Sequence, residues 1–179
     1  MRRRMRKGGV ERRLKMVLDK TREHIRKYGW SVIGVFPDQD GGEPGFSYSV
    51  GFTHTLKHPE IFVVGLNQQT AQVLLNDLGN RIRKGERFDE PVMVDKLLRE
   101  YSAAIRPITD ETAREYSNVG RAALRGVKFE ACQLFYPDQV GRFPWDHDCD
   151  PRIAEAQTAL FEYVGEPPTG FIPGGRPGH

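Results

Sequence analysis

Every second position is apolar between residues 46 and 53, where phenylalanine, tyrosine and valine alternate with serine, glycine and threonine. A period of two is typical of a β-strand with one buried face. The stretch 30–36 is rich in β-branched and aromatic residues, and the turn-forming run 37–45 separates the two stretches, which favours a β-hairpin. On this pattern we expect Ser47 and Ser49 to point outward or into a cleft.

Further apolar stretches extend the predicted sheet. The stretch 61–66 has no polar position, which indicates a strand covered on both faces at the centre of the sheet. The pattern also predicts a strand over 127–136 and short strands over 91–94 and 101–107.

Apolar residues recur with the period of a helix over 10–28 and 68–84. Asn67 is a suitable N-cap for the second of these helices, and two shorter helices are predicted after Thr109 and Asp150. Strands and helices do not alternate strictly. We therefore predict an α+β fold, a single domain with a mostly antiparallel or mixed β-sheet packed by helices.

The composition is typical of a globular protein that buries a core. The chain has 179 residues, of which 38% are hydrophobic and 28% are charged. No run approaches the roughly 18 apolar residues of a membrane helix, and the N-terminal region is too polar for a signal peptide. The two cysteines form no CxxC pair, which agrees with a reducing compartment. We expect a cytoplasmic protein.

Charge is distributed unevenly along the chain. Residues 1–28 hold 12 basic and 3 acidic side chains, a net charge of +9, whereas the remainder holds 15 basic and 21 acidic ones, a net charge of −6. We expect residues 1–9 to be a disordered basic arm and 10–28 a basic amphipathic helix. The α+β core domain should cover 29–164, and 165–179 should be a disordered tail rich in proline and glycine.

The polar turn before the predicted central strand holds the first candidate site. His54 and His58 are four residues apart, but Pro59 disfavours the helix that places both histidines of the zinc motif H-E-x-x-H on one face. His58 with Glu60 is instead a candidate acid–base pair, with Tyr48 as a hydrogen-bond donor. The competing interpretation is that His58 and Glu60 bond to backbone groups and hold the turn.

The irregular loop 137–150 holds a second set of candidate residues. We assign Asp138, Arg142 and Asp146 as polar contacts and Trp145 as an apolar wall, because small-molecule sites combine aromatic walls with a few fixed polar groups. Other side chains of the loop are potential metal ligands, but their spacing matches no zinc motif, so we assign no metal site. The competing interpretation is a solvated acidic loop that its aromatic residues anchor to the core.

The basic N-terminal segment is a third candidate. Its arginines can neutralise phosphates in a way that depends on salt and not on sequence. The residues assigned to nucleic-acid or partner binding are Arg2, Arg3, Arg4, Arg6, Arg12 and Arg13. The competing interpretation is the ordinary solvated face of an amphipathic helix.

Two blocks of the sequence carry a family resemblance. The first block comprises Tyr48-Ser-Val-Gly51, His58-Pro59-Glu60, Gly65-Leu66, Leu75-Asn76 and Gly85. The second comprises Pro137-Asp138 and Gly141-Arg142-Phe143-Pro144-Trp145-Asp146. In these residues the chain resembles the bacterial domain-of-unknown-function family DUF4262, over roughly residues 29–146. The resemblance implies a shared fold and a shared site but no particular reaction, and His54 is outside the pattern.

These observations lead to one expectation and two alternatives. We expect a small bacterial or bacteriophage protein that binds a small molecule or peptide, with or without catalysis, in a cleft between the His58 turn and the loop 138–146. The first alternative is an interaction module that binds nucleic acid or an acidic protein through residues 1–28. The second is that the histidine and tryptophan motifs only fasten loops to the core. The residues point to no particular cofactor, and we expect no membrane contact.

Overall fold

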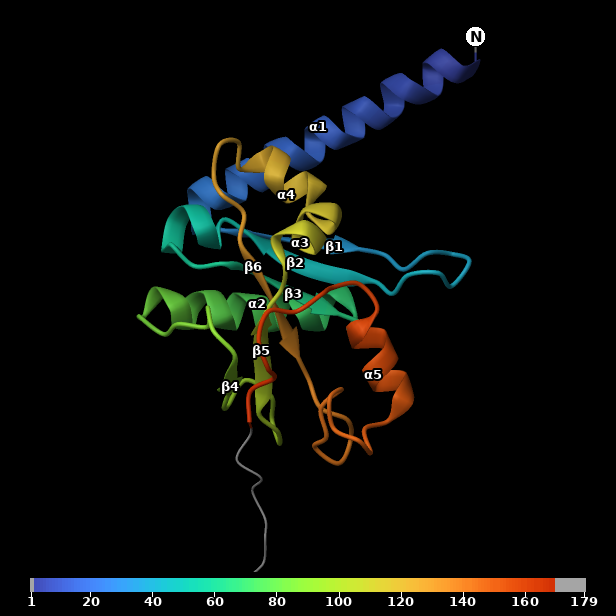
Figure 1. Ribbon diagram of the computed structural model, residues 1–179. Coiled ribbons are helices and arrows are strands. Elements are labelled where there is room, and N and C mark those ends of the chain that lie inside the picture. Colours follow the sequence, from blue (N-terminus) through green and yellow to red (C-terminus); the bar gives the residue numbers. More distant parts are fainter. Residues whose placement is uncertain (1, 170–179) are drawn as a thin grey trace, which may run out of the picture.

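The sheet in the computed structural model has six strands in the order β1-β2-β3-β6-β5-β4 (Figure 1). The structure describes residues 2–169, with side chains from residue 8 onward. The strands are β1 (Ser31–Val35), β2 (Phe46–Val50), β3 (Glu60–Val64), β4 (Val92–Val94), β5 (Ala103–Pro107) and β6 (Ala131–Phe135).

Helices pack on this sheet, which confirms the predicted α+β class. They are α1 (Arg2–Tyr28), the π-helix η1 (Phe52–Leu56), α2 (Gln68–Arg83), α3 (Asp110–Tyr116), α4 (Asn118–Ala123) and α5 (Pro151–Thr158). Within the described residues, no helix combines the length and the apolar character needed to span a bilayer. The sequence pattern missed η1 and α4, both of which are short.

The strand pairing confirms the predicted hairpin and the predicted central strand. β1 and β2 are antiparallel, with Ser31 opposite Val50 and Val35 opposite Phe46. β3 lies third in the sheet, antiparallel to β2 and parallel to β6. β5 pairs antiparallel with both β6 and β4. The parallel β3–β6 pair at the centre makes the sheet mixed.

Different segments cover the two faces of the sheet. On one face, the buried side of α2 packs on alternate residues of β3, β5 and β6. On the other face, α3, the end of α4 and the segment after α5 pack on the aromatic residues of β2 and β3. Because both faces are covered, Ser47 and Ser49 are buried, and the prediction that they point outward or into a cleft is wrong.

Helix α1 begins earlier than the sequence predicts. It runs from Arg2, so that residues 2–9, for which we expected a disordered arm, are its first turns. Arginine, methionine and lysine, which make up residues 2–7, favour a helix, whereas Gly8 and Gly9 do not. The C-terminal half of α1 packs against α4 and β1, while the N-terminal half projects beyond the body (Figure 1). Of the predicted tail, residues 170–179 lie outside the described residues.

Candidate functional site

Glu60, at the start of β3, has a fully buried carboxylate that accepts five hydrogen bonds. Oε1 accepts from the backbone N–H of Gly51 (2.8 Å) and from the N–H and hydroxyl of Thr53 (both 3.1 Å). Oε2 accepts from the hydroxyl of Ser49 (2.6 Å) and from the N–H of Phe52 (3.2 Å). These three N–H groups stand at the first turn of η1, where a helix leaves its donors unpaired, so Glu60 caps η1.

The surroundings of Glu60 favour a structural role. Burial raises the pKa of Glu60 to about 7, and the hydrogen bonds from Ser49 and the backbone oppose that rise. Because five donors occupy its two oxygens, the carboxylate has little capacity left to accept a hydrogen bond from a ligand. It fastens the η1 turn to β3.

His58 is buried as well, with 1% of its surface exposed. Its Nδ1 donates to the carbonyl of Pro59 (2.7 Å), and its Nε2 accepts from the N–H of Phe88 (2.9 Å). The second bond requires the neutral tautomer with the proton on Nδ1, and burial lowers the pKa of this imidazole in agreement. His58 therefore ties the turn before β3 to the loop between α2 and β4.

The acid–base pair expected from the sequence is not formed. His58 bonds to backbone carbonyl and N–H groups, while Glu60 turns toward η1, and no hydrogen bond joins the two side chains. Tyr48, the expected donor, stacks on Phe62 with ring centroids 4.7 Å apart and accepts a hydrogen bond from the N–H of Gly120 (3.2 Å). Burial raises the pKa of Tyr48 to about 12. This tyrosine is part of the core.

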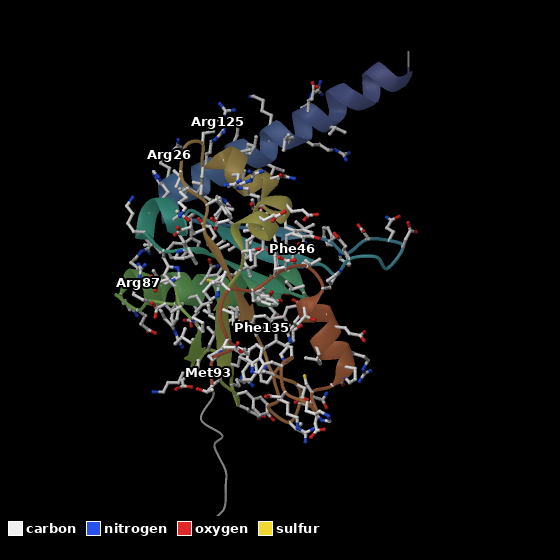
Figure 2. The ribbon with its side chains drawn as sticks, viewed as in Figure 1. Arg26, Phe46, Arg87, Met93, Arg125 and Phe135 are labelled. Atoms are coloured by element: carbon white, nitrogen blue, oxygen red, sulfur yellow. The ribbon has the colours of Figure 1, made fainter. Side chains whose placement is uncertain are left out.

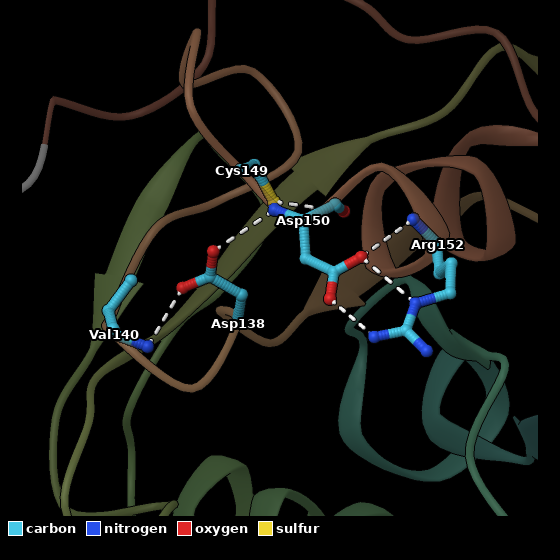
Figure 3. A network of polar contacts seen from close by, with 5 residues as sticks. All are labelled: Asp138, Val140, Cys149, Asp150 and Arg152. Carbon is cyan, nitrogen blue, oxygen red and sulfur yellow. Dashed lines mark hydrogen bonds and ion pairs between the residues drawn. The ribbon is translucent and has the colours of Figure 1, made fainter.

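Acidic side chains fasten the loop between β6 and α5 (Figure 3). Asp138 accepts hydrogen bonds from the backbone N–H groups of Val140 (3.0 Å), Arg142 (2.9 Å) and Asp150 (3.1 Å). Although burial acts to raise it, the pKa of Asp138 is lowered, because these N–H groups stabilise the charged form. Asp146 accepts a similar bond from the backbone N–H three residues before it (2.7 Å). Both aspartates shape the loop.

Trp145 and Arg142 also act within this loop. Trp145 stacks on Phe143 with ring centroids 5.0 Å apart and meets Phe135 of β6 edge to face. The guanidinium of Arg142 donates to the carbonyl of Asp148 (2.7 Å). These contacts agree with the competing interpretation, in which the aromatic residues of the loop anchor it to the core.

The two candidate segments lie at opposite ends of the central strand pair. His58 stands just before β3, whose Glu60 pairs with Ala131 at the beginning of β6, whereas Trp145 contacts Phe135 at the end of β6. At a rise of about 3.3 Å per residue, roughly 13 Å of strand separates these ends. The cleft expected between the His58 turn and the loop is therefore not formed.

A different hollow lies between α1, η1 and the end of α4, and we call it the basic groove. Its volume is about 700 Å³. Its charged and imidazole side chains are Arg22, Arg26, His54 and Arg125, and its lining residues include no carboxylate. Ile25, Leu124 and Val127 add apolar surface to it.

Arg22 holds the basic groove together, and two other arginines are free in it. The Arg22 guanidinium donates to the carbonyls of Ala122 (3.0 Å) and Ala123 (3.4 Å), which ties α1 to the end of α4. Arg26 and Arg125 come from different segments and are both exposed; within the described part of the chain they form no hydrogen bond or ion pair through their side chains (Figure 2). Their charges are available to a ligand. No sequence pattern marks Arg125, because its loop meets α1 only in the tertiary structure.

The arginines assigned from the sequence lie mostly toward the start of α1. Arg12 and Arg13 are exposed there and form no ion pair with any described residue. The side chains of the other four, Arg2, Arg3, Arg4 and Arg6, lie outside the described residues, so their assignment stays a prediction. Among the side chains that the structure does describe, no three His, Cys, Asp or Glu residues gather closely enough to hold a metal ion.

The comparisons with known proteins give one match. A family model described as a domain of unknown function (DUF4262) matches residues 24–150, a span that contains all six strands of the sheet. The curated proteins give no match, and the solved structures give none either.

Proposed function

The chain belongs to the DUF4262 family, whose description names no activity, and we propose from its geometry that it is a nucleic-acid-binding module. The phosphate backbone contacts Arg26 and Arg125 in the basic groove. One observation carries the proposal: two segments contribute unpaired arginines to one hollow, and no carboxylate lines it.

The chemistry of the free arginines suits phosphate. A guanidinium presents several N–H donors in a plane and binds phosphate oxygens in pairs. Arg22 is already bonded to α4, so it shapes the groove while Arg26 and Arg125 contact the ligand. His54, on η1, adds an imidazole N–H that can donate to the same anion.

The charge distribution directs a polyanion to this side of the molecule. Residues 1–28 carry a net charge of +9 and the remainder carries −6. The acidic remainder repels a polyanion while α1 attracts it, so binding is oriented and sensitive to salt.

The fastened turns support a structural role for the residues first assigned to a ligand cleft. Backbone groups occupy the polar atoms of His58 and Asp138, and five donors occupy those of Glu60. A small molecule or peptide would find no free acid or base at these positions. We therefore place ligand binding in the basic groove.

Fluorescence anisotropy with labelled single-stranded RNA, single-stranded DNA and duplex DNA tests the proposal. We expect the wild-type protein to bind with an affinity that falls steeply as salt rises. The double variant Arg26→Glu/Arg125→Glu should bind at least about tenfold more weakly, and its salt slope should fall by about one for each lost phosphate contact. Arg99→Glu is the control for a charge reversal outside the groove, since Arg99 is exposed there, and it should bind nearly as wild type.

Two results would contradict the proposal. Equal loss of affinity in the double variant and in Arg99→Glu would show that the groove has no special part in binding. If the wild-type protein binds none of the three nucleic acids but does bind polyglutamate, the partner is instead an acidic protein.

A further inference from the structure

We propose that the projecting half of α1 docks an acidic amphipathic helix of a partner protein. The surface concerned is the projecting stripe, which we define as Val10, Leu14 and Val17. This proposal uses another part of α1 than the basic groove and does not depend on nucleic-acid binding.

The projecting stripe continues a line of residues that is already a packing surface. Val10, Leu14 and Val17 follow one another at the i, i+4 and i+7 spacing of one helix face and are 67%, 47% and 44% exposed. Further along the same face, Thr21 is buried and Ile25 is packed against the core. The face therefore continues from the packed part of α1 onto the half that projects from the body, whose course Figure 1 shows.

Two glycines make this part of α1 dependent on outside support. Gly8 and Gly9 lie within the helix, and apart from their chain neighbours and the backbone of α1 itself, no described atom stands within 4 Å of the position that a Cβ would take at either one. Glycine is a poor helix former, and a helical segment without tertiary contacts is only marginally stable in water. A helix packed along the projecting stripe would supply the missing contacts.

Charge selects the kind of partner. Residues 2–20 contain 9 basic and 2 acidic side chains, a net charge of +7. A second copy of this chain would bring the same charge against itself, so self-association through this surface is disfavoured. A nucleic acid would neutralise the charge and leave the apolar side chains in water. An acidic helix with an apolar stripe satisfies both features, with leucine-type side chains on Leu14 and carboxylates beside Arg12 and Arg13.

The test uses the full chain and two labelled synthetic peptides. In the first peptide leucines form one helical face and glutamates fill the rest; the second has the same composition with the leucines scrambled. We expect the amphipathic peptide to bind about tenfold more tightly than the scrambled one. Leu14→Gln, which removes apolar surface without changing charge, should weaken that binding by about tenfold.

Met16→Gln is the matched control. Met16 is 66% exposed, but two positions from Leu14 place it about 200° around the helix, on the other side from the projecting stripe. This variant should bind the amphipathic peptide as the wild type does. Both variants should keep the nucleic-acid affinity of the wild type, so the two proposals fail independently.

Three results would overturn the inference. Equal binding of the two peptides would show that charge alone attracts them. Equal loss of binding in Leu14→Gln and Met16→Gln would remove the projecting stripe from the contact. If the wild type sediments as a dimer and Leu14→Gln sediments as a monomer, a second copy of this chain occupies the projecting stripe.

Discussion

Glu60 joins three elements through one side chain. Its carboxylate accepts from β2 at Ser49 and from η1 at Phe52, and it starts β3 itself. Ser49 extends the network, because its hydroxyl also accepts from the N–H of Ile61 (2.9 Å). Removing a buried acceptor leaves its donors unsatisfied, and this costs more than the hydrogen bonds contribute when formed.

Glu60→Gln should therefore destabilise the protein although it keeps the size of the side chain. The new amide nitrogen cannot accept the hydrogen bonds that one carboxylate oxygen accepts now. The hydroxyls can rotate to other partners, but one or two backbone N–H groups lose their acceptor, and we expect the free energy of unfolding to fall by about 2–4 kcal/mol. Urea denaturation measures this loss.

Glu130→Gln serves as the control for that substitution. Glu130 lies next to β6, and its side chain is about half exposed and paired with Lys128, so its loss should cost less than about 1 kcal/mol. Equal destabilisation in both variants would mean that the hydrogen bonds to Glu60 have no special weight.

His58 should make stability depend on pH below neutrality. Burial lowers the pKa of His58 below its ordinary 6.5 in the folded state, so the unfolded chain takes up a proton first and acidification favours unfolding. The stability that neutral His58 contributes is present above pH 6.5 and is lost as the pH falls below it. Glu60, with its pKa raised from 4.5 to about 7, acts in the opposite direction over that window.

The variant His58→Gln separates the two effects. The difference in unfolding free energy between wild type and this variant cancels the contribution of Glu60. We expect this difference to favour the wild type above pH 7 and to shrink as the pH falls below 6.5. Urea denaturation at a series of pH values measures it, and a difference that stays constant with pH would contradict the neutral, backbone-bonded imidazole.

At the scale of the element, α2 has the clearest local signals. The Asn67 side chain accepts a hydrogen bond from the N–H of Thr70 (2.8 Å), as its position before the helix predicts. The apolar residues of α2 that recur at helical spacing are buried and cover one face of the sheet: Ala71, Leu74, Leu75, Leu78 and Ile82. The cap and the stripe together fix where α2 begins and which side faces the core.

Asn67→Ala should lower the free energy of unfolding by about 1 kcal/mol, because alanine cannot cap the free N–H groups of the first turn. Thermal and urea denaturation measure the change. Gln69→Ala is the control in the same turn, since Gln69 is exposed and alanine is a better helix former, and it should leave stability within about 0.5 kcal/mol. A loss of the same size in both variants would contradict the cap.

For the whole molecule, sequence periodicity predicted those features that depend on neighbouring residues. The β1–β2 hairpin, the apolar centre of β3 and the stripe of α2 are all local patterns. The parallel pairing of Glu60 with Ala131 is not, because it joins distant segments, and an apolar strand looks alike in parallel and antiparallel sheets. Alternation likewise indicated that Ser49 points to the opposite face of the sheet from Tyr48. It did not indicate that a second layer covers that face.

The candidate site was harder to predict than the fold. His58 and Glu60 are close in sequence, yet each bonds to a different neighbouring segment, which only the tertiary structure decides. The basic groove depends on Arg125 meeting α1, and nothing near that residue in sequence signals the contact. The basic character of α1 was visible in the sequence, because a count of charges is independent of how the chain folds.

The central parallel pair also sets the order in which this protein can be completed during synthesis. β3 is made long before β6, and the residues 65–130 between them must be added before its second edge is paired. Until then the growing chain carries an apolar strand with one open side, which is the kind of edge that other chains can join. Aggregation of newly made chains is thus a risk built into the topology, and it ends when β6 leaves the ribosome and closes the sheet.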